Sequence, residues 1–144
     1  MKKKIVLNAC GVKSLGGVKL FVEAFEYFSS INENILVLYS ENEFYGELKN
    51  QTYENNRVRF IQLSKKRYLH PFLNFLIGKK LMDEINKSDA IIHFGNFGFN
   101  TQSKSFVFVQ NVLPFTSKNI KNRLLLFFIN KSFKRCDNIV VQLD

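Results

Sequence analysis

The first forty residues constrain the fold most strongly, because they read as a buried strand, a glycine loop and an amphipathic helix. The apolar run 4–10 ends at a glycine, which is typical of a strand buried in a sheet. Apolar side chains recur at helical spacing through residues 18–28. Between them lie Gly16 and Gly17, where we expect backbone angles that glycine adopts most readily. Such a unit holds backbone N–H groups and the positive end of a helix dipole at a strand end, which suits a phosphate.

The spacing of the glycines excludes two common phosphate-binding motifs. Four residues separate Gly11 from Gly16, so the dinucleotide fingerprint G-x-G-x-x-G does not fit. In a Walker A motif, lysine and a hydroxyl residue follow the second glycine, but Gly17 and Val18 stand there. Two interpretations stay open: an anion-binding loop, and a tight strand-to-helix turn that holds no ligand.

Strand and helix patterns alternate along the rest of the chain. Helical spacing predicts a short helix at 44–48 and longer helices at 67–85 and 118–135. This alternation predicts an α/β fold, with a doubly wound, mostly parallel sheet flanked by helices and right-handed crossovers. Further strands are predicted at residues 35–39, 58–61, 89–94, 105–109 and 138–141.

Three loops follow predicted strands directly, at residues 11–17, 93–98 and 110–115. Ligands of parallel α/β sheets bind beyond the carboxyl ends of the strands. We therefore expect these loops to meet at one edge of the sheet and to form the functional site.

Composition limits the partners. A net charge of +9 favours phosphorylated ligands or an anionic membrane surface. Nucleic acid is not expected, because the lysines are scattered and no RNA-binding motif occurs.

No His, Asp and Glu cluster has ligand spacing, so we expect no metal. Cys10 and Cys136 are predicted to be small core residues, and two distant thiols fit a reducing cytoplasm.

Three stretches together resemble the amino-terminal domain of GT-B fold glycosyltransferases, in particular the family 4 type that builds bacterial surface polysaccharides. They are residues 5–25 with the Gly–Gly pair, residues 92–96, and residues 109–115 followed by a basic, aromatic helix. The resemblance covers essentially the whole chain, and residues 110–115 are its most specific part.

This resemblance implies two Rossmann-like domains that face a cleft. The amino-terminal one, here the single domain 1–144, would mainly hold the acceptor, while its Gly–Gly loop approaches the diphosphate of a nucleotide-sugar donor. The family's donor-binding carboxyl-terminal domain, with its paired glutamates, is absent from the sequence. We therefore expect this chain to need a donor-binding domain or chain for activity, and to use no metal or other cofactor.

Several residues carry two interpretations. Gly16 and Gly17 are predicted to donate N–H groups to the donor phosphates. Gln110 and Asn111 are predicted to bind sugar, or to form an Asx-type turn. His93 either faces the cleft and titrates, or is a hydrogen-bonded structural histidine. Asn96 either contacts the acceptor, or adopts a positive φ in its loop.

The helix at 118–135 is predicted to turn one apolar face to the sheet, formed by Leu125, Leu126, Ile129 and Phe133. Its other face mixes cations and large apolar groups, which suits an anionic membrane surface or a partner domain. Additional core burial is the alternative. The residues of this second face are Lys121, Arg123, Leu124, Phe127, Phe128, Lys131, Lys134 and Arg135.

Two functions are therefore expected. One is the amino-terminal part of a cytoplasmic glycosyltransferase that transfers a sugar to a glycan or lipid-linked acceptor, peripherally bound at the inner face of the membrane. The alternative is a noncatalytic module that recruits the acceptor or the membrane to a separate donor-binding chain. An NAD-dependent oxidoreductase is excluded by the glycine spacing.

Overall fold

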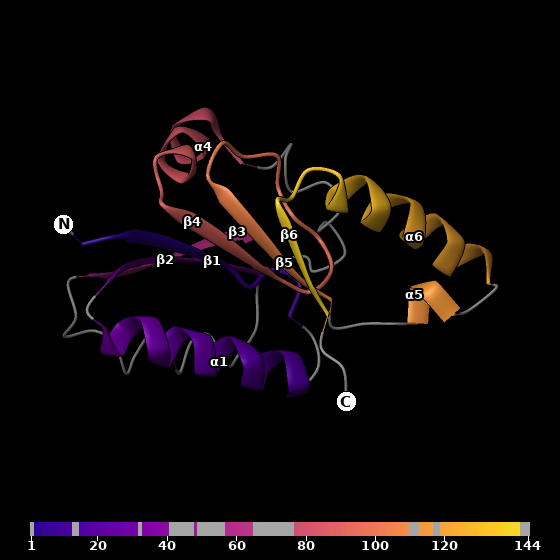
Figure 1. Ribbon diagram of the computed structural model, residues 1–144, viewed down its shortest axis with the longest axis horizontal. Helices are drawn as coiled ribbons and strands as arrows, with labels where there is room; N and C mark the ends of the chain where they lie inside the picture. Colours follow the sequence, from indigo (N-terminus) through magenta and orange to yellow (C-terminus); the bar gives the residue numbers. More distant parts are fainter. Residues whose placement is uncertain are drawn as a thin grey trace.

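One parallel sheet with helices on both faces forms the protein, and the α/β prediction is confirmed. Figure 1 shows α1 on one face of the sheet and α4 on the other. The strands are β1 Lys4–Asn8, β2 Asn34–Ser40, β3 Val58–Ser64, β4 Ala90–Phe94, β5 Lys104–Val109 and β6 Asn138–Val141. The computed structural model describes residues 2–12, 15–31, 33–40, 48, 57–64, 77–109, 113–116 and 119–141.

The strand order is β3-β2-β1-β4-β5-β6, and each neighbouring pair is parallel. This is the order of a Rossmann-like fold, in which the chain winds outward from β1 on one side and from β4 on the other. All six strands coincide with predicted ones. The apolar runs behave as predicted because central parallel strands are buried on both faces.

Alternating side chains of the strands build a core on each face of the sheet. On the face of α1 (Leu15–Ser30), Leu7 and Phe94 pack with Phe21 and Phe25 of the helix. The ring of Phe21 meets that of Phe94 edge to face, with centroids 5.6 Å apart. Val6 and Ile91 point to the opposite face, where they join Ile85 of α4 (Lys79–Asn86) and Phe99. The sheet is therefore covered from both sides, as a doubly wound fold requires.

Two expectations about local backbone are wrong. Gly16 and Gly17 lie in the first turn of α1, and the positive φ angles in the described chain belong instead to Gly95 and Asn96. Of the predicted helix 67–85, residues 67–76 lie outside the described residues, and α4 begins only at Lys79, after Gly78 with its extended backbone (ψ 153°). Extended angles are typical of the residue before a helix, so Gly78 marks the start of α4 and is not part of a helix that the apolar spacing extends through it.

The helix predicted at 118–135 is shorter in the structure than its sequence pattern indicated. It becomes α6, Ile120–Phe133, and the side chain of Asn119 caps it by accepting a hydrogen bond from the N–H of Lys121 at 2.9 Å. A four-residue helix, α5 Leu113–Thr116, lies within the stretch predicted as a loop. Of the short helix predicted at 44–48, only Leu48 is described, and it is buried in the core beside α1.

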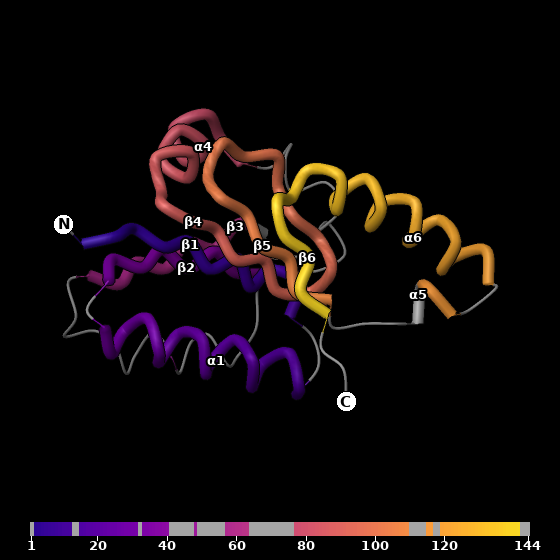
Figure 2. The backbone as a smooth tube through the Cα atoms, viewed as in Figure 1, coloured from indigo at the N-terminus to yellow at the C-terminus, as the bar shows by residue number. Residues whose placement is uncertain are grey.

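The connection from β4 to β5 contains no helix. Figure 2 traces residues 95–103 as an open path from the end of one strand to the start of the next. Parallel neighbours are usually joined through a helix, so this short connection leaves part of the sheet face to be covered in another way. Phe99 of the connection fills that space and is completely buried.

Candidate functional site at the carboxyl edge of the sheet

Strands β1, β4 and β5 are neighbours and run in the same direction, so the loops after them meet at one edge. The direction of winding reverses between β1 and β4, and such a reversal is where parallel α/β proteins bind ligands. The three strand ends therefore share one edge, as expected, and the loops after β1 and β4 touch there. The described part of the third loop behaves differently, because residues 113–115 belong to α5, where Phe115 stacks on Phe133 of α6 with centroids 6.2 Å apart. Residues 13–14 and 110–112 of these loops lie outside the described residues.

The loops after β1 and β4 touch through glycine backbones. A Cβ atom at Gly95 would lie 2.7 Å from the carbonyl carbon of Gly11, and one at Gly11 would clash with the carbonyl oxygen of Phe94. Gly95 also has a φ of 98°, which side chains strongly disfavour. Only glycine fits at either position. A glycine follows each of the two strands in the sequence, which indicates a tight backbone there. The contact between Gly11 and Gly95 was not predicted, because it depends on β1 and β4 being neighbours in the sheet.

The first turn of α1 points its N–H groups toward this edge. The N–H groups of a first helical turn have no partner within the helix and carry the positive end of its dipole. Gly16 is exposed, and an added Cβ would meet no neighbouring atom within 4 Å, whereas Gly17 is buried. Space for an anion therefore exists beside Gly16, and phosphate binding there stays a prediction.

His93 lies inside the sheet edge and is completely buried. It pairs in register with Asn8 of β1, whose Nδ2 lies 3.0 Å from the Nδ1 of the ring. The Asn8 Oδ1 accepts the N–H of Cys10 at 3.2 Å, which fixes the amide so that its Nδ2 donates to the histidine. The N–H of Phe99 approaches Nε2 at 3.4 Å. An N–H group thus lies beside each ring nitrogen, and because a neutral imidazole accepts at only one of them, only one of the two donates a hydrogen bond to the ring.

Burial lowers the pKa of His93 to about 3. Since N–H groups face both ring nitrogens, a protonated ring would have no acceptor on either side. The imidazole is therefore neutral at physiological pH. This geometry favours the structural alternative for His93, because its side chain reaches no surface of the described protein. Asn8, the polar end of an otherwise apolar run, is the partner that the sequence analysis missed.

Asn96 combines a positive φ of 69° with nearly complete burial. Its N–H donates to the carbonyl oxygen of Phe108 at 3.2 Å, which ties the loop after β4 to β5. This agrees with the positive-φ alternative for Asn96, and its contact with an acceptor stays a prediction. Gln110 and Asn111, predicted to bind sugar, lie outside the described residues.

The connection 95–103 packs closely against the end of α6 and is hydrogen-bonded to it. The N–H of Gly98 donates to the hydroxyl of Ser132, and a Cβ atom at Gly98 would clash with the sulfur of Cys136. The same Cβ would lie 3.2 Å from the ring of His93. Gly98 is therefore required by close packing, and the seam between this connection and α6 closes over the histidine.

The two thiols are protonated under physiological conditions. Burial raises the pKa of Cys10 to about 12 and that of Cys136 to about 11. Cys10 is buried and Cys136 half-buried, and neither forms a disulfide. Their expected role as small packing residues agrees with this environment, because nucleophilic cysteines have lowered pKa values.

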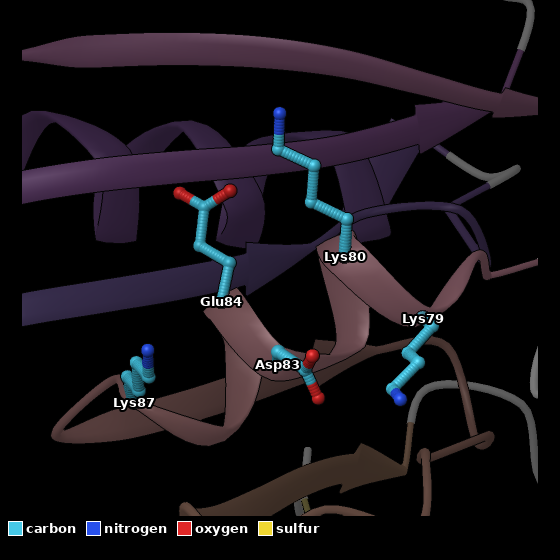
Figure 3. A pocket seen from close by; sticks show the side chains of 5 residues that line it. All are labelled: Lys79, Lys80, Asp83, Glu84 and Lys87. Atoms are coloured by element: carbon cyan, nitrogen blue, oxygen red, sulfur yellow. The ribbon is translucent and has the colours of Figure 1, made fainter.

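Two cavities of the described chain lie away from the carboxyl edge. One, of about 600 Å³, lies along α4, and Figure 3 shows that Lys80 and Glu84 point toward the strands while Lys79 and Asp83 point away. Its lining side chains do not converge on one point. The other, of about 360 Å³, lies where β1, β2 and β3 begin and is lined by Lys4, Asn34, Ile35, Leu36, Arg57, Arg59 and Glu84.

Glu84 connects these two cavities through ion pairs. Its carboxylate binds the ammonium of Lys4 at 2.7 Å and the guanidinium of Arg59. Burial opposes its ionisation, but the hydrogen bonds from the two cations outweigh burial and lower its pKa. The pairs link α4 to β1 and β3, so we assign this cluster a structural role.

The outer face of α6 is exposed, as the sequence predicted for most of its members. All five cations predicted there are exposed, as are Leu124 and Phe127. Phe128 is half-buried and packs edge to face on Phe127, with centroids 5.6 Å apart. Ile120, which the sequence analysis missed, is the most exposed apolar side chain of the helix. Of the face predicted to be buried, only Ile129 is completely so.

The described residues contain no group of three or more His, Cys, Asp or Glu side chains placed to hold a metal ion. None of the described helices is both long enough and apolar enough to cross a membrane. Compared with protein-family models, with curated proteins and with solved structures, the chain matches none of them.

Proposed function

We propose that this chain is the amino-terminal, acceptor-side part of a cytoplasmic glycosyltransferase. The enzyme would move a sugar from a nucleotide-sugar donor to a glycan or lipid-linked acceptor, and a further domain or chain would bind the donor. The observation that carries the proposal is the carboxyl edge of the sheet, where the loops after β1 and β4 touch, α1 begins and β5 ends.

Two properties of this edge support a role in holding a phosphorylated sugar donor against an acceptor. The exposed backbone at Gly16 leaves room for a diphosphate at the positive end of α1. The diphosphate gains negative charge as its bond to the anomeric carbon of the sugar breaks and the acceptor oxygen bonds to that carbon, so fixed N–H donors stabilise the transition state. The close contact of Gly11 with Gly95 holds the loops after β1 and β4 next to each other at this edge.

The chain's own contribution would be binding and electrostatics rather than proton transfer. Within the described residues, the titratable side chains at the carboxyl ends of β1 and β4 are those of Cys10 and His93. Both are buried, and their pKa values keep them uncharged at neutral pH. A general base would therefore come from the acceptor, from the donor-binding part or from residues outside the described chain.

This observation also favours the second candidate, a noncatalytic module that presents the acceptor or the membrane to a separate donor-binding chain. The two candidates differ in turnover. We would measure sugar release from a panel of nucleotide sugars with this chain alone and together with donor-binding proteins encoded beside it. The enzyme proposal expects turnover in the mixture, and turnover by this chain alone would contradict the division of the site.

Gly16→Val tests the loop in the active mixture. Because no atom of the described residues lies within 4 Å of a Cβ placed at Gly16, the fold should persist while the valine blocks the approach of the diphosphate. We expect turnover to fall about a hundredfold, the effect of losing one transition-state donor. Gly78→Ala is the matched control, since Gly78 is equally open but lies at the start of α4. Unchanged turnover with Gly16→Val would mean that the glycine loop is only a strand-to-helix turn and does not bind the diphosphate.

A further inference from the structure

We propose that α6 docks on an anionic lipid bilayer, with its amino-terminal half lying in the interface. This inference uses a different surface from the carboxyl edge, so it holds or fails independently of the proposed sugar transfer. It begins with three large apolar side chains of the helix that the protein leaves exposed: Ile120 at 82%, Leu124 at 60% and Phe127 at 61%.

These side chains form one stripe. At 3.6 residues per turn, Ile120, Leu124 and Phe127 fall within about 60° of one another around the helix axis. Ile129, the completely buried residue of α6, lies on the opposite side. The helix therefore turns one apolar stripe to the protein and a second one to the outside. In water the outer stripe is unfavourable, because each exposed side chain loses the free energy that burial would provide.

Cations flank the outer stripe, and acids are missing from it. Arg123 and Lys121 are exposed on either side of its amino-terminal half, while Lys131 continues its line toward the carboxyl end. No Asp or Glu occurs anywhere from residue 119 to residue 136. An apolar stripe between cations matches a bilayer surface, which offers acyl chains to the stripe and anionic headgroups to its flanks.

The position of the helix allows this contact. In Figure 1 the amino-terminal half of α6 extends beyond the strands, and α5 is the element beside it. The carboxyl-terminal half is anchored to the connection 95–103 through Ser132. One half of α6 therefore fixes the helix to the domain, and the other half presents the stripe.

The test measures binding of the chain to lipid vesicles by sedimentation. Vesicles of phosphatidylcholine with phosphatidylglycerol are compared with vesicles of phosphatidylcholine alone. We expect binding to the anionic vesicles, weakened at high salt and at least tenfold weaker in pure phosphatidylcholine. Absence of binding to anionic vesicles, or equal binding to both kinds, would overturn the proposal.

Two double variants separate the two contributions. Lys121→Gln with Arg123→Gln should weaken binding about 25-fold, since each cation near the surface contributes about fivefold. Leu124→Asn with Phe127→Asn should weaken it at least tenfold, because the stripe no longer inserts. Circular dichroism would verify that both variants fold, since all four side chains are exposed.

Tyr27→Asn is the matched control, because Tyr27 is 60% exposed on α1 beside the acidic Glu23 and Glu26. It should bind vesicles as the unchanged chain does. Equal loss of binding in this control would mean that exposed apolar groups act non-specifically. A second contrary result is that the unchanged chain forms a dimer in solution and that the variant with both Leu124→Asn and Phe127→Asn is a monomer that still binds vesicles. The stripe would then contact a second copy of the chain and not the bilayer.

Discussion

Helices α1 and α6 have similar lengths, 16 and 14 residues, yet the protein covers them very differently. The inner face of α1 packs Phe21 and Phe25 against the sheet, and its exposed face is polar apart from two separate side chains, Leu15 at the first residue of the helix and Tyr27 near its end. Helix α6 completely buries Ile129 and leaves three large apolar side chains outside. The exposed apolar side chains of α1 are therefore scattered, whereas those of α6 form one stripe on a helix that completely buries a single apolar residue. Apolar content beyond what a sheet needs is the feature that points to a binding surface.

The largest expected effect contrasts two phenylalanines. Phe21→Ala should reduce the free energy of unfolding by about 3 to 5 kcal/mol, because it removes a completely buried ring between the helix and Phe94. Phe127→Ala should change it by no more than about 0.5 kcal/mol. Urea denaturation measures both. A large loss for Phe127→Ala would mean that the outer face of α6 is covered in the isolated protein.

A second contrast compares two glycines near the start of α1. Gly11→Ala should cost about 3 kcal/mol, because its methyl group would clash with the backbone of Phe94 and Gly95. Gly16→Ala should be neutral or slightly stabilising, since the position is open and helical and alanine favours helices. Thermal or urea unfolding gives both values. Equal costs would contradict the close contact between the loops after β1 and β4.

The free energy of unfolding should fall in acid because of His93, which is buried in β4 next to the contact between Gly98 and the end of α6. Burial lowers the pKa of His93 to about 3 in the folded protein, whereas the unfolded chain protonates near pH 6.5. Between these values the unfolded state binds more protons, so stability falls as the pH falls below about 6.5. From pH 7 to pH 5 we expect a loss of about 2 kcal/mol.

His93→Gln is the control for this acid response, because it removes the titrating ring. The variant should be less stable at pH 7, but its free energy of unfolding should change little between pH 7 and pH 5. The pKa values of Glu84 and Asp137 are lowered below the ordinary carboxylate range, so these groups titrate at more acidic pH. An equal pH slope in the variant would show that another group causes the loss.

The sequence was sufficient to predict the sheet because its strands are dense apolar runs. A central parallel strand needs apolar residues on both faces, and the resulting runs are visible without knowing their neighbours. Local backbone was harder to predict. The apolar spacing of 67–85 continues through Gly78, and periodicity alone does not reveal that Gly78 adopts an extended conformation before α4.

The candidate site was less predictable, because it depends on which strands are neighbours. Asn8 and His93 are 85 positions apart, and they meet only because β1 and β4 pair in register. The exposure of Ile120 was missed for a related reason. Helix α6 carries apolar residues on nearly all sides, so its pattern does not indicate which stripe the sheet will cover. The orientation of α6 is instead fixed by contacts made elsewhere in the chain, such as the hydrogen bond between Ser132 and Gly98 of the connection 95–103.

The smallest expected effect concerns the thiols and reports on the same seam. Cys136 lies where the connection 95–103 meets the end of α6, and its pKa of about 11 leaves about one thiolate in a thousand at pH 8. Cys10 is more deeply buried, with a pKa of about 12. With a disulfide reagent such as Ellman's, we expect slow modification of Cys136 and slower modification of Cys10, and rapid reaction of both in urea. Faster reaction of Cys10 would mean that the β1 edge opens before the seam beneath α6, and so would reverse the order of stability between the two regions.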